Sequence, residues 1–156
     1  MRNPVLPVVL LFIVFMGTNC AKSKTCSPKS VSSEAAQMQA YATANGITAT
    51  VHASGLYYEI VAPGSGATAS ANSNVFITYT GKLLDGTIFD QQSNSAATGW
   101  PLNQLIEGWR AGLPLIKEGG HIKLIVPSAM AYGCVGKGVI PGNAILFFDI
   151  SLIDVQ

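Results

Sequence analysis

The chain has 156 residues, 49% of them hydrophobic and 11% charged, which suits a single domain with appendages. Lys and Arg number 9 against 8 Asp and Glu, a formal net charge of +1, so nothing indicates the basic patch that nucleic-acid-binding proteins usually carry. The 16 Gly and 8 Pro favour a β-rich domain with many turns over a helical bundle.

The first residues are typical of a secretory signal peptide. Arg2 supplies a positive charge, and residues 8–16 contain no polar side chain. This run is shorter than the roughly 20 apolar residues of a transmembrane helix, so we predict a signal peptide over 1–19. Cys20 directly after it resembles the lipidated cysteine of bacterial lipoproteins, although Asn19 stands where a small residue is usual. The alternative is an ordinary signal peptide with Cys20 left unmodified; both place the mature protein outside the cytoplasm.

The cysteines and histidines form no recognisable metal site. Cys20, Cys26 and Cys134 lie in no Cys-x-x-Cys spacing, and His52 and His121 have no ligand-type neighbour in sequence, so we expect no metal. We expect Cys26 to lie unpaired in a tether, and Cys134 to be unpaired, partly exposed and dispensable for activity. A Cys26–Cys134 disulfide is the alternative.

A tether and a helix precede the main domain. Residues 20–31 are small and polar, which predicts a flexible tether. An N-terminal helical unit follows over 32–46: alanine-rich sequence favours helix, Ser32 or Ser33 can cap its start, and an Asn-Gly pair ends it.

One face of this helix is apolar. Met38 and Tyr41 are three residues apart and so lie on the same side. We expect this side to pack against the flank of the following domain, and a dimerisation or substrate-binding role is the alternative.

Residues 51–156 alternate between β-rich runs and turn signals. Strands are expected over 55–61, 75–80, 87–90, 121–126 and 144–153, and a short helix over 105–113. Trp109 on that helix needs an apolar surface to bury against. We therefore predict an α+β fold, in which an antiparallel sheet of about five strands wraps around one short helix, with an extra N-terminal helix.

Residues of acid–base or nucleophilic chemistry are not arranged in any familiar motif. No Gly-x-Ser-x-Gly, phosphate loop or His-Glu-x-x-His is present. Aromatic residues instead gather near turns and strand ends, at Tyr79, Phe89, Trp100, Trp109, Tyr132, Phe147 and Phe148. Such residues are core, or they form an apolar ligand pocket, and composition alone leaves both readings open.

Four segments decide between these readings, because in this order they resemble the FKBP family of peptidyl-prolyl cis/trans isomerases. They are VFITYTGKLLDGTIFD (75–90), LIEGWRAGL (105–113), PSAMAYG (127–133) and VIPGNAILFFD (139–149). The resemblance covers roughly residues 55–153. Each motif is weak alone, and four in register are specific.

The resemblance implies roles for individual residues. Asp90, Tyr132 and the backbone N–H of Ile106 would be the catalytic groups, and Trp109 the indole on which the substrate proline ring rests. The remaining substrate-binding residues would form aromatic walls, an aliphatic edge and an overhanging loop, namely Tyr79, Phe89, Phe148, Leu105, Val139 and Ile140. Trp100 would replace a phenylalanine of the pocket.

Three departures from the family pattern fall in one loop. Gly142 stands where the family has a second proline, Cys134 directly follows Tyr132-Gly133, and Lys137 lies near a histidine position in a shortened loop. We expect these changes to affect loop rigidity and substrate preference more than the chemistry.

The resemblance implies an isomerase without cofactor or metal that acts on X–Pro bonds during the folding of exported proteins. Its partners would be proline-containing unfolded polypeptides, macrolide-type inhibitors and, through Cys20, a membrane; nucleic acid is not expected. We expect a periplasm-facing lipoprotein, with the outer membrane favoured. The alternative is a non-catalytic chaperone or binding lipoprotein on the same fold, for instance one that uses the 32–44 helix to bind a partner.

Overall fold

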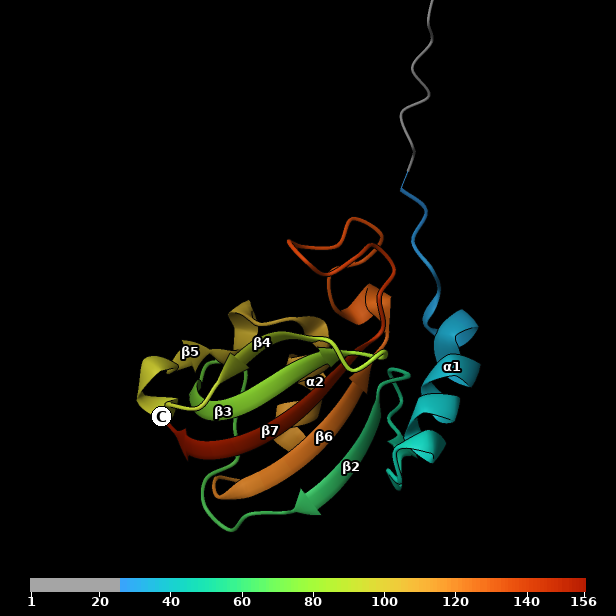
Figure 1. The fold of residues 1–156 in the computed structure, drawn as a ribbon. Coiled ribbons are helices and arrows are strands. Elements are labelled where there is room, and N and C mark those ends of the chain that lie inside the picture. Colours follow the sequence, from blue (N-terminus) through green and yellow to red (C-terminus); the bar gives the residue numbers. More distant parts are fainter. Residues whose placement is uncertain (1–25) are drawn as a thin grey trace, which may run out of the picture.

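An antiparallel β-sheet wraps around one short helix in the computed structural model, which describes residues 26–156 (Figure 1). The predicted signal peptide at 1–19, Cys20 and the first part of the predicted tether lie outside the described residues. The α+β class, the sheet around a short helix and the extra N-terminal helix are confirmed. Within residues 26–156, no helix is long and apolar enough to cross a membrane.

The sheet has the strand order β1-β2-β6-β7-β3-β4, with β5 paired to β3. All of these pairings are antiparallel. Relative to the five expected strands, the structure adds the two-residue strands β1 and β5. In chain order the helices, 3-10 turns (η) and strands are α1 (Val31–Ala44), β1 (Thr50–Val51), β2 (Tyr57–Ala62), β3 (Asn74–Leu83), β4 (Ile88–Gln92), η1 (Ser95–Ala97), β5 (Trp100–Pro101), η2 (Leu102–Gln104), α2 (Glu107–Gly112), η3 (Leu113–Leu115), β6 (Gly120–Val126), η4 (Ser128–Met130) and β7 (Leu146–Val155).

The inner face of the sheet carries the residues that the two-residue alternation predicts. On β3, Val75, Ile77 and Tyr79 are buried while the residues between them are only partly so. The other inward residues are Ile122, Leu124 and Val126 of β6 and Leu146, Phe148, Ile150 and Leu152 of β7. Together with Trp109 and Leu113 they form one core between sheet and helix.

Two glycines let α2 approach the sheet closely. A Cβ on Gly108 would lie 2.4 Å from Cγ1 of Val126, and one on Gly112 would lie 2.7 Å from Cδ1 of Leu124. The helix is shorter than the predicted 105–113, because Ile106 is extended at its N-cap and a 3-10 turn begins at Leu113.

The helix α1 packs on the outer side of the sheet, as expected from its apolar face (Figure 1). Met38 is fully buried, and the Tyr41 ring lies 5.6 Å from the ring of Phe147 on β7. Successive side chains of β7 therefore pack into two different hydrophobic cores, since Phe147 faces α1 while Phe148 faces α2.

The start of α1 differs from the expectation. The N-cap is Ser30, and neither Ser32 nor Ser33 has this role. The Ser33 N–H donates to Ser30 Oγ at 3.3 Å, and the Ser33 hydroxyl donates back to the Ser30 carbonyl at 2.6 Å. This reciprocal pair satisfies one free N–H of the first turn and moves the start of the helix to Val31.

Cys26 and Cys134 are joined by a disulfide, so the expectation that both are unpaired is wrong. Their Cα atoms are 5.5 Å apart although 108 residues separate them in sequence, a distance typical of disulfides. The described end of the predicted tether, from residue 26 on, is therefore attached to the main domain.

Candidate functional site

An apolar cavity of about 250 Å³ opens where the inner face of the sheet meets the start of α2. Its lining gathers strands β3, β4 and β7, the start of α2 and the loop after η4. The lining residues are Tyr79, Phe89, Asp90, Trp100, Leu105, Ile106, Trp109, Tyr132, Lys137 and Phe148. Sequence motifs as far apart as β3 and β7 thus meet around one volume, which we call the aromatic cavity.

A second cavity of about 270 Å³ adjoins the first and is lined by the overhanging loop. Val139 and Ile140 line it, together with Gly138. The two cavities share the residues Phe89, Asp90, Tyr132 and Lys137. Val139 is 73% exposed whereas Ile140 is 7% exposed, so Ile140 anchors this loop and Val139 is free to meet a ligand.

The floor of the aromatic cavity is Trp109, whose side chain is almost completely buried. Its ring meets Tyr79 and Phe148 edge-on, with centroids 5.0 and 5.1 Å away, and Phe89 meets Phe148 in the same way at 5.6 Å. Edge-to-face pairs of this kind hold the rings in fixed orientations. Within residues 26–156 the indole Nε1 has no hydrogen-bond partner, so the ring is held in place by its packing alone.

The polar side chains of the lining are Tyr79, Asp90, Tyr132 and Lys137, besides the two indole N–H groups. The Tyr79 hydroxyl donates to Asp90 Oδ2 at 2.7 Å, which orients the carboxylate. Burial and the adjacent Asp90 carboxylate raise the pKa of Tyr79 well above its usual range. Burial, followed by the charge of Asp90, raises the pKa of the Tyr132 phenol. Both phenols therefore stay protonated donors beyond neutral pH.

The Tyr132 hydroxyl and the Ile106 N–H are among the hydrogen-bond donors of the lining that have no partner within residues 26–156. The Tyr132 hydroxyl donates to no protein group there, and the N–H of Ile106 has no partner, whereas the Ile106 carbonyl accepts from Trp109 and Arg110. The extended Ile106 backbone, with ψ 150°, keeps its amide outside the helical hydrogen-bond pattern. A bound peptide could accept hydrogen bonds from both groups.

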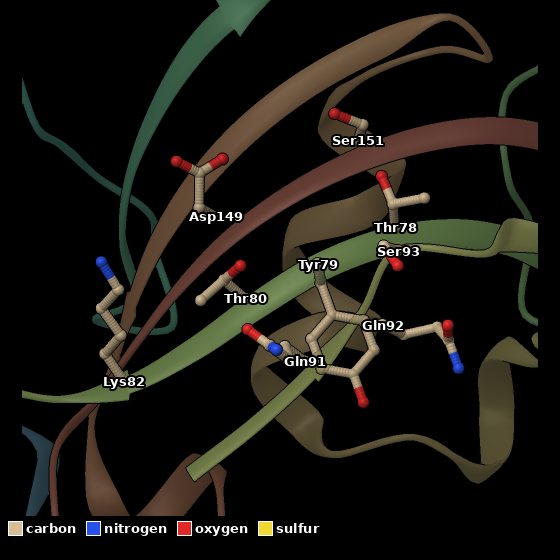
Figure 2. Close-up of a pocket in the computed structure, with 9 residues that line it drawn as sticks. All are labelled: Thr78, Tyr79, Thr80, Lys82, Gln91, Gln92, Ser93, Asp149 and Ser151. Carbon is tan, nitrogen blue, oxygen red and sulfur yellow. The ribbon is translucent and has the colours of Figure 1, made fainter. Parts of the chain in front are cut away.

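A larger, polar cavity of about 420 Å³ lies on the opposite face of the sheet (Figure 2). Hydroxyl, amide and charged side chains line it, among them Thr78, Thr80 and Asp149, while Tyr79 points to the other side of β3. His121 lies on this face, as expected for its strand position, and pairs with Asp149. Lacking an apolar wall, this groove does not suit an apolar ring.

Local contacts account for the positions at which this loop differs from the family pattern. A Cβ on Gly142 would lie 2.1 Å from the carbonyl oxygen of Cys134, so no side chain, and no proline ring, fits in this backbone path. Lys137 places its ammonium 5.5 Å from the centroid of the Tyr132 ring, a cation–π contact. The disulfide at Cys134, the glycine at 142 and Lys137 thus belong to one local arrangement.

The groups that attach this loop to the N-terminal segment were not predicted from the sequence. Glu34 is 1% exposed, and its carboxylate accepts from the N–H of Ser128 at 2.8 Å and from the Ser128 hydroxyl at 2.9 Å. An acidic residue in a first helical turn is normally read as a partner of the helix dipole. No local signal distinguishes it from a buried ligand of another segment.

The known proteins that this chain resembles in sequence are FKBP-type peptidyl-prolyl cis-trans isomerases. The family model described as FKBP-type peptidyl-prolyl cis-trans isomerase matches residues 66–153. The chain is 42% identical over 104 residues to the FKBP-type peptidyl-prolyl cis-trans isomerase FkpA of Aeromonas hydrophila, covering 66% of this chain and 39% of that protein. FkpA of Escherichia coli K12 is also 42% identical, over 106 residues, covering 65% of this chain and 38% of that protein.

Solved structures of peptidyl-prolyl cis-trans isomerases have a fold similar to that of this chain. The crystal structure of FkpA from Escherichia coli has a TM-score of 0.69 at 34% identity, over 81% of this chain and 61% of that one. A peptidyl-prolyl cis-trans isomerase from Pseudomonas syringae has a TM-score of 0.67 at 28% identity, over 83% of this chain and 98% of that one. The chain therefore spans about two fifths of the length of the curated relatives it matches, but nearly all of one solved structure.

Proposed function

Because the chain belongs to the FKBP-type peptidyl-prolyl cis-trans isomerase family, we propose that it accelerates cis/trans rotation of X–Pro bonds in exported polypeptides. The observation that carries the proposal is the aromatic cavity, with a buried indole floor, mostly apolar walls, and the Tyr132 hydroxyl and Ile106 N–H without a protein partner in residues 26–156. Its substrates would be proline-containing unfolded or partly folded chains, and macrolide-type inhibitors would occupy the same cavity.

The chemistry of the peptide bond explains why such a cavity suffices. Resonance makes the C–N bond rigid, with a rotation barrier of ~18–20 kcal/mol, and it places charge on the carbonyl oxygen. A twisted amide loses this resonance and is less polar. An apolar cavity therefore favours the twisted state over the planar one, which is the condition for catalysis.

Individual residues have distinct parts in this proposal. The proline ring rests on Trp109, and the Ile106 N–H and the Tyr132 hydroxyl hold carbonyl groups that flank the rotating bond. Asp90, oriented by Tyr79, lies beside the rotating amide. The other lining residues exclude water and shape the site. No proton transfer is part of the mechanism.

A refolding assay tests this function directly. A protein whose slow folding phase is limited by a prolyl bond is refolded with substoichiometric amounts of the chain. The slow rate should rise in proportion to the amount added. A non-catalytic chaperone or binding protein would leave the slow phase unchanged or retard it, and either result would contradict the proposal.

The pH dependence of turnover is the first prediction. We expect kcat/KM for a Leu-Pro peptide to be flat from about pH 6 to 9. The pKa of Tyr79 and that of Tyr132 are both raised, so the neutral phenols persist through this range. A bell or a slope measured with the protein still folded would reveal a proton-transferring group and refute the mechanism.

Removal of a single hydroxyl is the second prediction. Tyr132→Phe should lower kcat/KM by about 2- to 12-fold, since one neutral hydrogen bond contributes about 0.5–1.5 kcal/mol. The ring stays in place, so the free energy of unfolding should be nearly unchanged. A loss of more than about a hundredfold would indicate that the hydroxyl takes part in bond chemistry.

Location is the third prediction. We propose export, a lipid on Cys20 and a position facing the periplasm, with the outer membrane favoured because Ala21 is not the aspartate that retains enteric lipoproteins at the inner membrane. Cys20→Ser should move the protein from the membrane fraction to the soluble fraction of the cells. Membrane association that is unchanged in this variant would exclude the lipid anchor.

A further inference from the structure

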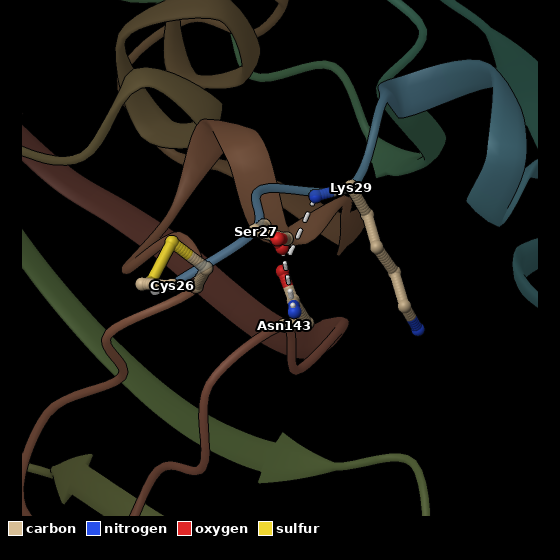
Figure 3. The surroundings of a disulfide bond; sticks show 5 residues. Cys26, Ser27, Lys29 and Asn143 are labelled. Carbon is tan, nitrogen blue, oxygen red and sulfur yellow. Dashed lines mark hydrogen bonds between the residues drawn. A yellow bond between two sulfur atoms is a disulfide. The ribbon is translucent and has the colours of Figure 1, made fainter. Parts of the chain in front are cut away.

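The N-terminal segment 26–34, here called the brace, holds the loop that lines the site, residues 128–143, at three separate points. The first is the Cys26–Cys134 disulfide. At the second, Asn143 donates from Nδ2 to the Ser27 carbonyl at 3.2 Å and accepts at Oδ1 from the Lys29 N–H at 3.3 Å (Figure 3).

The third point is buried. Glu34 accepts the N–H and the hydroxyl of Ser128 at the beginning of the same loop. The brace therefore contacts the loop near its start, in its middle and at its end. Tyr132 lies between the Ser128 contact and the disulfide, four residues after Ser128 and two before Cys134.

The loop is held partly by its own backbone hydrogen bonds and by the buried Ile140, but its composition makes added support useful. It contains four glycines, at 133, 136, 138 and 142, and Val135 at its tip is 83% exposed. Glycine-rich backbone has high conformational entropy. Yet the loop supplies Tyr132, Lys137, Val139 and Ile140 to the two cavities.

Short backbone contacts connect the braced residues to Tyr132. The Gly133 N–H donates to the Ser128 carbonyl at 2.8 Å, and the Asn143 N–H donates to the Gly133 carbonyl at 2.8 Å. Asn143 has φ 58°, a left-handed conformation that is uncommon outside glycine. Its side-chain bonds to the brace help to hold this conformation, and with it the residue next to Tyr132.

We propose that the brace is a positioning element of the isomerase site: the Cys26–Cys134 disulfide and Asn143 hold the Tyr132 hydroxyl where a bound peptide meets it. This inference rests on the proposed function. It makes full activity dependent on an oxidising compartment, and it replaces the expectation that Cys134 is dispensable. Cys26, Cys134 and Asn143 act through Tyr132 and do not touch substrate.

Reduction of the Cys26–Cys134 disulfide needs only an external dithiol. A dithiol such as dithiothreitol breaks the Cys26–Cys134 bond, delivers two electrons and two protons to give two thiols, and leaves as its own cyclic disulfide. The loop then keeps its covalent chain but loses its crosslink to the brace. Because the loop must be ordered again when substrate binds, we expect the loss to fall mainly on KM.

The test compares the exported Cys20→Ser chain, which has no third thiol, in oxidised and dithiothreitol-reduced forms. Reduction should lower kcat/KM for a Leu-Pro peptide about three- to tenfold, mostly through KM. In a Tyr132→Phe background, reduction should change kcat/KM less than about 1.5-fold. Asn143→Gly, which permits the left-handed backbone but removes the side-chain bonds, should show a smaller loss in the same direction.

Controls separate positioning from unfolding. Cys26→Ser/Cys134→Ser should behave like the reduced protein and should not respond to dithiothreitol, and urea unfolding establishes that each form is folded under assay conditions. Unchanged kinetics on reduction, or an equal loss in the Tyr132→Phe background, would overturn the inference. Calorimetric binding of the same peptide gives the comparison without turnover. An oxidised protein that binds peptide but does not turn it over refutes the proposed function and still tests the brace.

Discussion

Trp109→Ala is expected to lower the free energy of unfolding by about 3–5 kcal/mol, the usual cost of truncating a buried indole. The side chain is 5% exposed and packs edge-on against Tyr79 and Phe148. Because its Nε1 has no partner in the described part of the chain, residues 26–156, the substitution leaves no polar group there unsatisfied. The whole cost comes from lost apolar contact and from the cavity left behind.

Urea unfolding of the oxidised protein measures this loss, and Trp100→Ala is the matched control. Trp100 lines the same cavity but is only partly buried, so its removal should cost much less. Under the proposed function, Trp109→Ala should also abolish measurable isomerase activity, since it removes the floor on which we propose that the proline ring rests. Equal destabilisation by the two substitutions would contradict the assignment of Trp109 to both core and site.

Glu34→Ala is expected to cost about 2–4 kcal/mol, because hydrogen bonds to charged groups are strong and their buried partners are left unmade. The carboxylate is 1% exposed, and it accepts both the N–H and the hydroxyl of Ser128. Substitution by alanine leaves both Ser128 groups without a partner and loosens α1 from the domain.

Glu34→Gln is the matched control for this prediction. A glutamine amide can accept the Ser128 N–H with its oxygen and donate to the Ser128 hydroxyl with its nitrogen. The loss should therefore be roughly half that of alanine or less, measured by urea unfolding. An alanine variant as stable as the wild type would show that the Glu34–Ser128 contact does not hold α1 in solution.

The alternation of apolar residues determined much of the sheet. Val75, Ile77 and Tyr79 face the core because every second side chain of a strand points the same way, and this period is visible in the sequence. The pattern on α2 and the need to bury Trp109 likewise indicated a sheet wrapped around a helix. Such signals survive in the sequence because each depends on residues only two to four positions apart.

The motif resemblance predicted the residues of the candidate site, and the fold brings many of them together around one cavity. Tyr79 and Phe148 are 69 positions apart in the sequence, yet both rings contact Trp109. The sequence motifs predicted each of these residues separately. Only the sheet pairing of β3 with β7 places them around a common volume.

The tertiary structure alone decided the contacts of the N-terminal segment. Cys26 meets Cys134 across 108 residues, and Glu34 meets Ser128 across 94. The local sequence does not distinguish an unpaired surface cysteine from a disulfide cysteine. Nor does it distinguish an exposed glutamate at a helix start from a buried one. Their difference is created when two distant segments pack together, and periodicity, capping and composition contain no information about that distance.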